Sequence, residues 1–373
     1  MDDFTSALYL GFCHPAGQIP PWQCLTTGVP AALREPAINQ VVADQVAQMQ
    51  GLERGVLAPS SLHLFWDIFG KAGKETCILA DEKVYAIARW GLERAAARGA
   101  RVINFKHQDS KDLLLKLQRL APEKLTLLVV TDGWCPHCGK PAPLRDYLLL
   151  IRSYGGLLLL DDSQALGIMG KQPDQEMPGG KGGGGLLPWY GVQGDEIITI
   201  CSLAKGLGVP LSVISGSRAR IEEFKSRSET RVHSSPVSAA HVQATLQALS
   251  QHKKCGNLLR LKLLKNIRLF RKSLGKFGFT TYGSFFPVQT LKLPASTQPY
   301  AMYQQLLKMN IRALLLEPHR EEKPAISFCI NTLHTPEQLM RAAAGVKEAH
   351  QLCQRKVPRY VQPVTRVSSG LLM

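Results

Sequence analysis

The chain has 373 residues, 45% of them hydrophobic, which is enough to bury a large core and to form one large domain with a smaller one attached. No apolar run is long enough to span a bilayer, and the first residues, MDDFTSALYLGF, carry two acids where a secretory signal would be basic, so we expect a cytoplasmic protein. Nine scattered cysteines argue for reduced thiols rather than a disulfide scaffold, and the net charge of +16 does not by itself identify a partner.

Short apolar runs alternate with helical patterns in the first third of the chain. Helical spacing over 38–49 follows a proline-rich stretch, and VLAPSSLHLFWDIF predicts a strand, a turn at 58–61 and a helix. Another strand is predicted at 77–80, followed by a strand over 101–105 and a helix over 109–120. This alternation is typical of an α/β protein with a mostly parallel sheet.

The next predicted strand, 125–130, ends in TDGWCPHCGK. Its Cys135-x-x-Cys138 pair, with His137 inside it, is compatible with a zinc site, with thiol redox chemistry, or with an active-site loop whose thiols are incidental. A structural zinc needs four ligands, and no second pair with metal-like spacing lies nearby in the sequence. We therefore assign no metal and favour the active-site loop, while the role of the two cysteines stays open.

Two further apolar runs end in residues that carry chemistry. LLLLDDSQALGIMG (157–170) predicts a strand that delivers Asp161 to the carboxyl end of a parallel sheet, where open α/β proteins bind ligands. IITICSLAKGLG (197–208) predicts a later strand followed by Ser202, Lys205 and a glycine-punctuated loop. Such a lysine is either a snorkelling surface side chain or an amine that forms a Schiff base with an aldehyde cofactor. The glycine-rich segment between the two runs predicts a flexible crossing.

The later part of the chain is basic. It has no Asp or Glu from 230 to 316, and nine Lys or Arg residues between 252 and 276 alternate with leucines at near-helical spacing. This pattern predicts a basic amphipathic helix, either a solvated outer face or a surface for an anionic partner. A strand around 285–293, a helix over 300–309 and a strand over 325–330 predict a smaller α+β domain.

An aspartate and a lysine at these two strand ends suit pyridoxal 5'-phosphate, because the lysine can hold the aldehyde while the carboxylate keeps the pyridine nitrogen protonated. In this order and spacing the two motifs resemble the α-oxoamine synthases, a group of fold-type I pyridoxal-phosphate enzymes in the aminotransferase class I/II superfamily. Their pattern is Asp-(Asp/Glu)-Ala-His-x-x-Gly-x-x-Gly, then Ser/Thr-x-x-Lys and a glycine-rich loop. Residues 161–170 and 202–208 follow it, except that Ser163 replaces the Ala and Gln164 the His.

The resemblance extends over residues 4–352 and implies the aspartate-aminotransferase-like fold, with a mostly parallel seven-stranded sheet and a smaller α+β domain. It implies an N-terminal arm over 1–50, a large cofactor-binding domain over 51–240 and a small domain over 241–352. The remaining 353–373 are expected to be a disordered tail, because they lack periodicity. A YLG…HP stretch near the N-terminus resembles the family's arm, which packs across a homodimer and lines the active site.

The resemblance also implies a role for each site residue. Lys205 would form the Schiff base and move protons, Asp161 would stabilise the pyridinium, and Gln164 would contact the phenolic oxygen. Tyr85 falls where the family has a histidine that stacks on the cofactor ring, and an aromatic ring can supply the same contact. The cofactor phosphate would be held by Ser61 and Leu62 at a helix start, by Ser202, and across the dimer by Ser234 and Ser235. For Ser61, an ordinary helix cap without a ligand is the alternative.

Three departures from the family pattern affect the chemistry. Gln164 can donate a hydrogen bond but cannot exchange a proton near neutral pH, as the family's His can. The Arg and Asn that hold the substrate carboxylate in the family are Ala325 and Ala7 here. Either another cation replaces the Arg or the substrate is not an ordinary free α-amino acid. The candidate replacements in the same region are Arg312, His319, Arg320 and Lys323.

The predicted function is a decarboxylative Claisen-type condensation that joins an amine-bearing, amino-acid-like substrate to an acyl thioester. The acyl donor would be acyl-CoA or an acyl-carrier protein, recruited with help from the basic helix, and nucleic acid is not an expected partner. One alternative is an aminotransferase, or other pyridoxal-phosphate chemistry, with an atypical substrate. A second alternative is a non-catalytic binding protein, against which the retained Lys205 and Asp161 argue.

Overall fold

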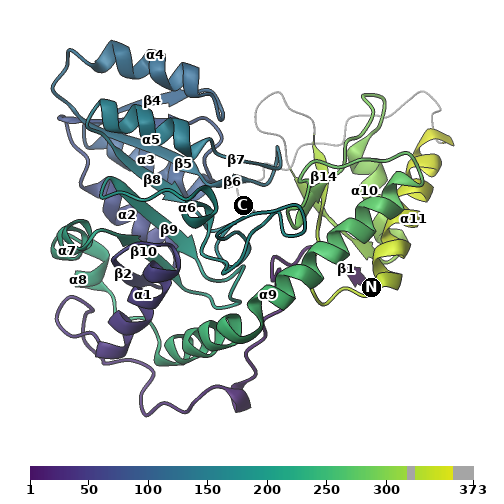
Figure 1. The fold of residues 1–373 in the computed structure, drawn as a ribbon, viewed down its shortest axis with the longest axis horizontal. Coiled ribbons are helices and arrows are strands. Elements are labelled where there is room, and N and C mark those ends of the chain that lie inside the picture. Colours follow the sequence, from purple (N-terminus) through teal and green to yellow (C-terminus); the bar gives the residue numbers. More distant parts are fainter. Residues whose placement is uncertain (317–323, 356–373) are drawn as a thin grey trace, which may run out of the picture.

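The computed structural model describes residues 1–316 and 324–355 and has two lobes joined by one long helix (Figure 1). The larger lobe contains a seven-stranded sheet with the strand order β2-β10-β9-β8-β5-β3-β4. Its strands are β2 (Arg54–Ala58), β3 (Thr76–Asp81), β4 (Arg101–Phe105), β5 (Thr126–Asp132), β8 (Leu157–Asp161), β9 (Ile197–Ser202) and β10 (Ser212–Gly216). The α/β fold and the mostly parallel sheet predicted from the sequence are confirmed.

Helices cover both faces of this sheet, which is why its strands are apolar on both sides and read as continuous hydrophobic runs. One face packs on α2 (Ser61–Gly70), α3 (Ala86–Ala97) and α7 (Arg218–Ser226). The other packs on α1 (Ala37–Met49), α4 (Ser110–Leu120) and α5 (Leu144–Ser153). Successive residues of β8 therefore face opposite sides of the sheet: Leu159 lies in one hydrophobic core, and Leu158 and Leu160 lie in the other. The short helices α6 (Leu186–Tyr190) and α8 (Glu229–His233) complete this lobe.

Strand direction determines where the functional side chains can meet. Only β10 runs antiparallel to its two neighbours, β2 and β9, and the other pairs in the sheet are parallel. Therefore β2, β9, β8, β5, β3 and β4 all point their carboxyl ends at one edge of the sheet. A small hairpin, β6 (Trp134–Cys135) and β7 (Lys140–Pro141), follows β5 at this edge.

The smaller lobe forms around the carboxyl half of α9 (Ala239–Gly275), as Figure 1 shows. It contains the sheet β11 (Val288–Thr290), β14 (Ala325–Cys329) and β13 (Leu314–Leu316), with α10 (Pro299–Lys308) and α11 (Pro336–Arg355). The N-terminal strand β1 (Asp2–Asp3) pairs with β12 (Ile311–Arg312) in this lobe, before the chain crosses to α1 in the other. The domain boundaries stay a prediction. Helix α11 continues through residue 355, and residues 356–373 of the predicted tail lie outside the described residues.

The glycine-rich segment that precedes α6 is closely packed, so the flexible crossing expected from its composition is wrong. Lys171 and Lys181 form an isolated β-bridge within it. A Cβ on Gly170 would lie 1.9 Å from the Lys181 carbonyl oxygen, and one on Gly184 would lie 1.9 Å from the Met49 carbonyl oxygen. These glycines let backbones approach each other closely and are not a sign of mobility.

The basic amphipathic helix is confirmed as part of α9, but two of its cations, Arg260 and Arg271, are not among the exposed side chains. Seven of the nine basic side chains between 252 and 276 are exposed. Arg260 is only 6% exposed, and its Nη1 donates to the Gly167 carbonyl oxygen at 2.8 Å. Within the part of the chain that the structure describes, no helix combines the length and the apolar character that a membrane crossing needs.

Candidate active site

Lys205 lies in the turn that follows β9 and is partly buried. Among the described residues, no hydrogen bond or ion pair holds its Nζ, although electrostatic interactions link it to Asp132 and Cys201. The amine is therefore placed near a carboxylate without being tied up in a salt bridge. This arrangement suits a reactive amine more than it suits a lysine that snorkels to the surface.

Two carboxylates stand side by side at this edge. Asp161 ends β8 and is opposite Asp132, which ends β5, in the register of the two strands. Asp161 is 9% exposed, and its Oδ1 accepts from the Ser163 backbone N–H at 3.0 Å. Burial and the neighbouring Asp161 raise the pKa of Asp132 well above its usual value, so Asp132 favours its neutral form. Sequence reasoning missed Asp132, although it too is a carboxylate at the end of an apolar strand.

Gln164 is oriented by the N-terminal arm. The hydroxyl of Tyr9, which is 1% exposed, donates to Gln164 Oε1 at 2.7 Å. Burial raises the pKa of Tyr9 well above its usual value, so the hydroxyl stays a donor. Because Oε1 is occupied and Nε2 makes no hydrogen bond among the described residues, the amide nitrogen is left as a donor. The sequence placed Tyr9 in the arm but gave no sign of this contact.

The start of α2 reaches the same edge. Ser212 of β10 is opposite both Ser202, the last residue of β9, and Ala58, the last residue of β2. The N-cap residue Ser60 makes no side-chain hydrogen bond to the first turn of α2, because its Oγ pairs with His63 Nδ1 at 2.9 Å. The first-turn N–H groups, which include those of the predicted residues Ser61 and Leu62, thus lack a side-chain cap. A helix start of this kind binds anions such as phosphate.

Ser202 and Tyr85 adjoin the two carboxylates. The Ser202 backbone N–H donates to Ser163 Oγ at 2.8 Å, which ties the end of β9 to the loop after Asp161. The Tyr85 backbone N–H donates to Asp132 Oδ1 at 3.2 Å, and its side chain is 46% exposed. Burial, Asp161 and Asp132 raise the pKa of the Tyr85 hydroxyl. The structure thus brings both residues together with Asp161 and Lys205.

Ser234 and Ser235 are not joined to this group within one chain. Ser234 follows α8, where its hydroxyl donates to the Thr230 carbonyl oxygen at 2.6 Å and its own carbonyl accepts from the Ala31 N–H at 2.8 Å. Its polar contacts among the described residues do not include the Lys205 loop. Ser235 is exposed. A contribution of these serines to the site of a second subunit stays a prediction.

The two alanines that replace the family's carboxylate-holding residues, Ala7 and Ala325, are both partly buried. Of the cations proposed to compensate, Arg312 is exposed on β12. His319, Arg320 and Lys323 lie outside the described residues.

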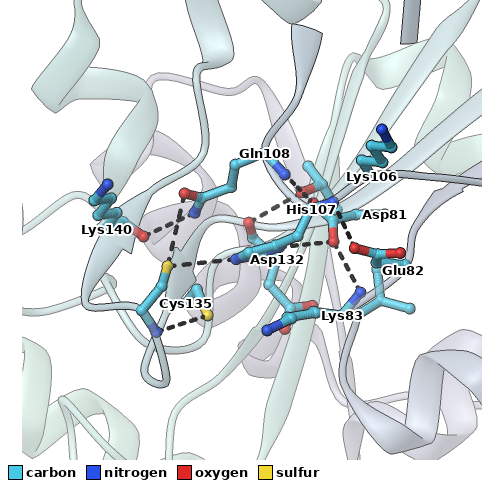
Figure 2. A network of polar contacts seen from close by, with 12 residues as sticks. Asp81, Glu82, Lys83, Lys106, His107, Gln108, Asp132, Cys135 and Lys140 are labelled. Atoms are coloured by element: carbon cyan, nitrogen blue, oxygen red, sulfur yellow. Dashed lines mark hydrogen bonds and ion pairs between the residues drawn. The ribbon is translucent and has the colours of Figure 1, made fainter. Parts of the chain in front are cut away.

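A second cluster lies farther along the same edge (Figure 2). His107, which follows β4, contacts Asp81 through Nδ1 at 2.8 Å and Cys138 Sγ through Nε2 at 3.4 Å. Burial alone would lower the pKa of His107, but its hydrogen bonds to Asp81 and Cys138 outweigh this effect and raise the pKa to about 9. The hydrogen bond from Cys135, with help from His107, lowers the pKa of Cys138 to about 4, and the pKa of Cys135 rises. The sequence analysis noted the two cysteines but missed His107.

Asp162, next to Asp161, points away from this group and predicts a pH effect on stability. It is fully buried, its Oδ2 accepts from the Leu186 N–H at 2.8 Å, and burial raises its pKa from 3.8 to about 8. The folded protein therefore holds a proton that the unfolded chain has released, so stability is lost as pH rises from about 4 to about 8. We expect Asp162→Asn, which keeps an oxygen for the Leu186 N–H, to remove this loss.

The measurement is urea unfolding of the wild type and of Asp162→Asn at pH 5 and at pH 8. From pH 5 to pH 8 the wild type should lose a few kcal/mol of its free energy of unfolding, and the variant should not, since each unit of pKa shift corresponds to about 1.4 kcal/mol. An equal stability difference at both pH values would contradict the prediction.

Comparison with known proteins adds an independent observation. The sequence model described as aminotransferase class I and II matches residues 66–346. The 8-amino-7-oxononanoate synthase of Thermosipho melanesiensis is 28% identical over 268 residues, which are 71% of this chain and 65% of the relative's length, just under two thirds. The serine palmitoyltransferase of Sphingomonas wittichii superposes with a TM-score of 0.82 at 19% identity, over 95% of this chain and 88% of that one. A structure described as SPT with PLP has a TM-score of 0.80 at 19% identity and the same coverage.

Proposed function

The chain belongs to the aminotransferase class I and II family, and from this premise we propose that it binds pyridoxal 5'-phosphate and joins an amine-bearing substrate to an acyl thioester. The observation that carries the proposal is the convergence of Lys205, Asp161 and the uncapped start of α2 at one edge of the sheet. An amine, a carboxylate and a cluster of N–H donors are complementary to an aldehyde, a pyridine nitrogen and a phosphate.

Each residue present suits one part of the cofactor. Lys205 would bond to the aldehyde carbon, and Asp161, which has one oxygen without a hydrogen bond among the described residues, would pair with the pyridine nitrogen. Gln164 Nε2 would donate to the phenolic oxygen, and Tyr85 would cover the ring. The phosphate would be held by the N–H groups of Ser61 and Leu62, by Ser202, and by Ser234 and Ser235 across a dimer.

When bound, pyridoxal phosphate supplies an electron sink for the carbanion that forms next to the substrate nitrogen. Lys205 is the base and acid of the proposed reaction, because its Nζ is held by no described partner and interacts electrostatically with Asp132. The Tyr9 hydroxyl keeps Gln164 in one orientation. Asp132, neutral beside Asp161, limits the negative charge at this edge. Gln164 cannot act as a proton carrier, so we assign that task to Lys205 alone.

The acyl donor is proposed to be a thioester of coenzyme A or of an acyl-carrier protein. The exposed cations of α9 give an anionic carrier a surface to approach, with Lys253, Lys254, Lys262, Lys265 and Arg268 among them. We further propose a homodimer, because α1 and the arm before it expose large apolar side chains such as Leu25, Leu33 and Val41. A cytoplasmic location is proposed because nine cysteines scattered through a long chain favour reduced thiols over a disulfide scaffold.

The experiment measures thiol released from acyl-CoA by the purified, cofactor-loaded protein, with a panel of amino acids and amines that lack a free carboxylate. We expect thiol release that depends on the amine. Carboxylate-free amines are included because Ala7 and Ala325 stand where the family has the Asn and Arg that hold the substrate carboxylate. The matched control omits the amine and should release no thiol above background.

Amino-group transfer to a keto acid without thiol release would point to a transaminase instead. Absence of both reactions with every amine would leave the binding-protein alternative and contradict the proposed condensation.

A further inference from the structure

Three metal-type ligands from two segments of the chain meet beside the proposed active site without sharing its residues (Figure 2). They are His107, which follows β4, and Cys135 and Cys138 of the β6–β7 hairpin. One donor atom from each lies within 4.8 Å of the other two. We propose that these three side chains bind a thiophilic divalent ion of the zinc type, with an oxygen ligand in the fourth position.

The hairpin is folded as a two-cysteine metal loop requires. The Cys138 backbone N–H donates to Cys135 Sγ at 3.4 Å, and the Gly139 N–H donates to the Cys135 carbonyl oxygen at 2.9 Å. Gly139 has a φ of 68°, a left-handed conformation that a glycine adopts without strain and that turns the chain back after Cys138. Together these contacts bring the two sulfurs close, and an N–H group pointed at sulfur stabilises a thiolate, the form that binds metals.

His107 is held in the orientation of a metal ligand. Its Nδ1 contacts Asp81 Oδ1 at 2.8 Å, which leaves Nε2 directed at Cys138 Sγ, 3.4 Å away. Asp81 is 2% exposed and also accepts the backbone N–H groups of Lys83 and Gln108, each at 2.9 Å. A carboxylate bonded to the far nitrogen of the ring is the usual support of a metal-binding histidine.

The cluster also has the right size. Zinc bonds of about 2.3 Å to sulfur and about 2.0 Å to nitrogen place tetrahedral ligands roughly 3.3–3.8 Å apart. The separation of His107 Nε2 from Cys138 Sγ is already in this range, and small side-chain rotations would bring Cys135 into place. Gln108 Oε1 lies 3.7 Å from Cys138 Sγ, so this oxygen or a water can complete the tetrahedron. Two thiolates would balance the charge of the dication.

An ion here would fasten the loop after β4 to the β6–β7 hairpin, and through Asp81 to the loop after β3, close to parts of the proposed active site. The loop after β3 leads from Asp81 to Tyr85, and β5 ends at Asp132 just before the hairpin. The hairpin also touches the smaller lobe, because Trp134 stacks on Phe286 with ring centroids 4.5 Å apart. The ion would therefore act as a structural brace, and its binding does not depend on whether the proposed condensation is correct.

The test uses cobalt(II) and zinc(II) on the reduced, full-length protein loaded with pyridoxal phosphate. We expect one cobalt ion per chain, with visible d–d bands of a tetrahedral thiolate site at wavelengths beyond the cofactor's absorption, and displacement of cobalt by zinc. Cys138→Ser and His107→Ala should lose these bands, whereas Cys24→Ser, at an exposed cysteine, should keep them. Thermal unfolding without metal shows whether each variant is folded.

Zinc should also raise the melting temperature of the wild type and of Cys24→Ser, but not of the other two variants. Absence of cobalt bands in the wild type would overturn the proposal. So would bands retained in both Cys138→Ser and His107→Ala, or a Cys135–Cys138 disulfide that forms as fast with zinc present as without it.

Discussion

Replacing Lys205 by alanine is expected to abolish the visible absorbance that pyridoxal phosphate has when bonded to a lysine, and to end turnover. The amine belongs to the turn after β9, interacts electrostatically with Asp132, and makes no hydrogen bond or ion pair among the described residues, so it is available to bond to the cofactor. Loss of proton transfer alone is worth about 10²–10⁴-fold in rate, and loss of the covalent contact adds to that. Absorbance of the reconstituted variant and its thiol release from acyl-CoA measure the two effects separately.

Lys225→Ala is the matched control, because this lysine of α7 pairs with Glu222 at 3.6 Å and has no place in the site. It should keep both the absorbance and the turnover. If Lys205→Ala kept the visible band, another lysine would hold the cofactor, and the assignment of the whole edge would need revision.

The sequence was sufficient to predict a strand and its functional residue where the two are neighbours in the chain. An apolar run followed by Asp161, and another followed by Lys205, each identify a strand and the residue at its end without knowledge of the neighbours. Parallel strands then bring both ends to one edge whatever the strand order. The fold class and the family predicted from these two motifs are confirmed.

His107 shows what local patterns cannot reveal. It follows β4, whereas Cys135 follows β5, and the two loops meet because both strands flank β3 in the sheet. Strand order leaves no mark on the sequence of any single strand, so a third ligand could not be assigned to the cysteine pair. A missing second pair of cysteines was therefore weak evidence against a metal.

Composition was also a poor guide to burial. Arg260 has the helical spacing of the exposed cations around it, yet its guanidinium donates to the Gly167 carbonyl oxygen and to Asn257 Oδ1. The glycines near residue 180 were expected to give flexibility, whereas several of them have no room for a Cβ. The Gly167 carbonyl oxygen is distant in the sequence from Arg260, and the glycines approach distant residues such as Met49 as well as one another across their own segment.

Asp161→Asn is expected to have the second-largest effect, because it removes a charge while it keeps the shape. The asparagine Oδ1 can still accept from the Ser163 N–H, so the loop after β8 should stay in place. Without the negative charge, the protonated pyridine that makes the cofactor an electron sink is no longer stabilised. We expect turnover to fall about 10²–10³-fold, the usual cost of losing one preorganised electrostatic contact, with weaker cofactor binding.

Asp162→Asn is the natural comparison, since it makes the same change of side chain at the next residue in the chain, where the carboxyl is already protonated and bonds to the Leu186 N–H. Thiol release and cofactor titration of the two variants, measured near pH 7, should separate them: Asp162→Asn active, Asp161→Asn nearly inactive. Equal losses in both would mean that a distorted loop, and not the missing charge, explains the effect. Full activity in Asp161→Asn would assign the pyridine nitrogen to Asp132, the carboxyl that stands opposite Asp161 on β5.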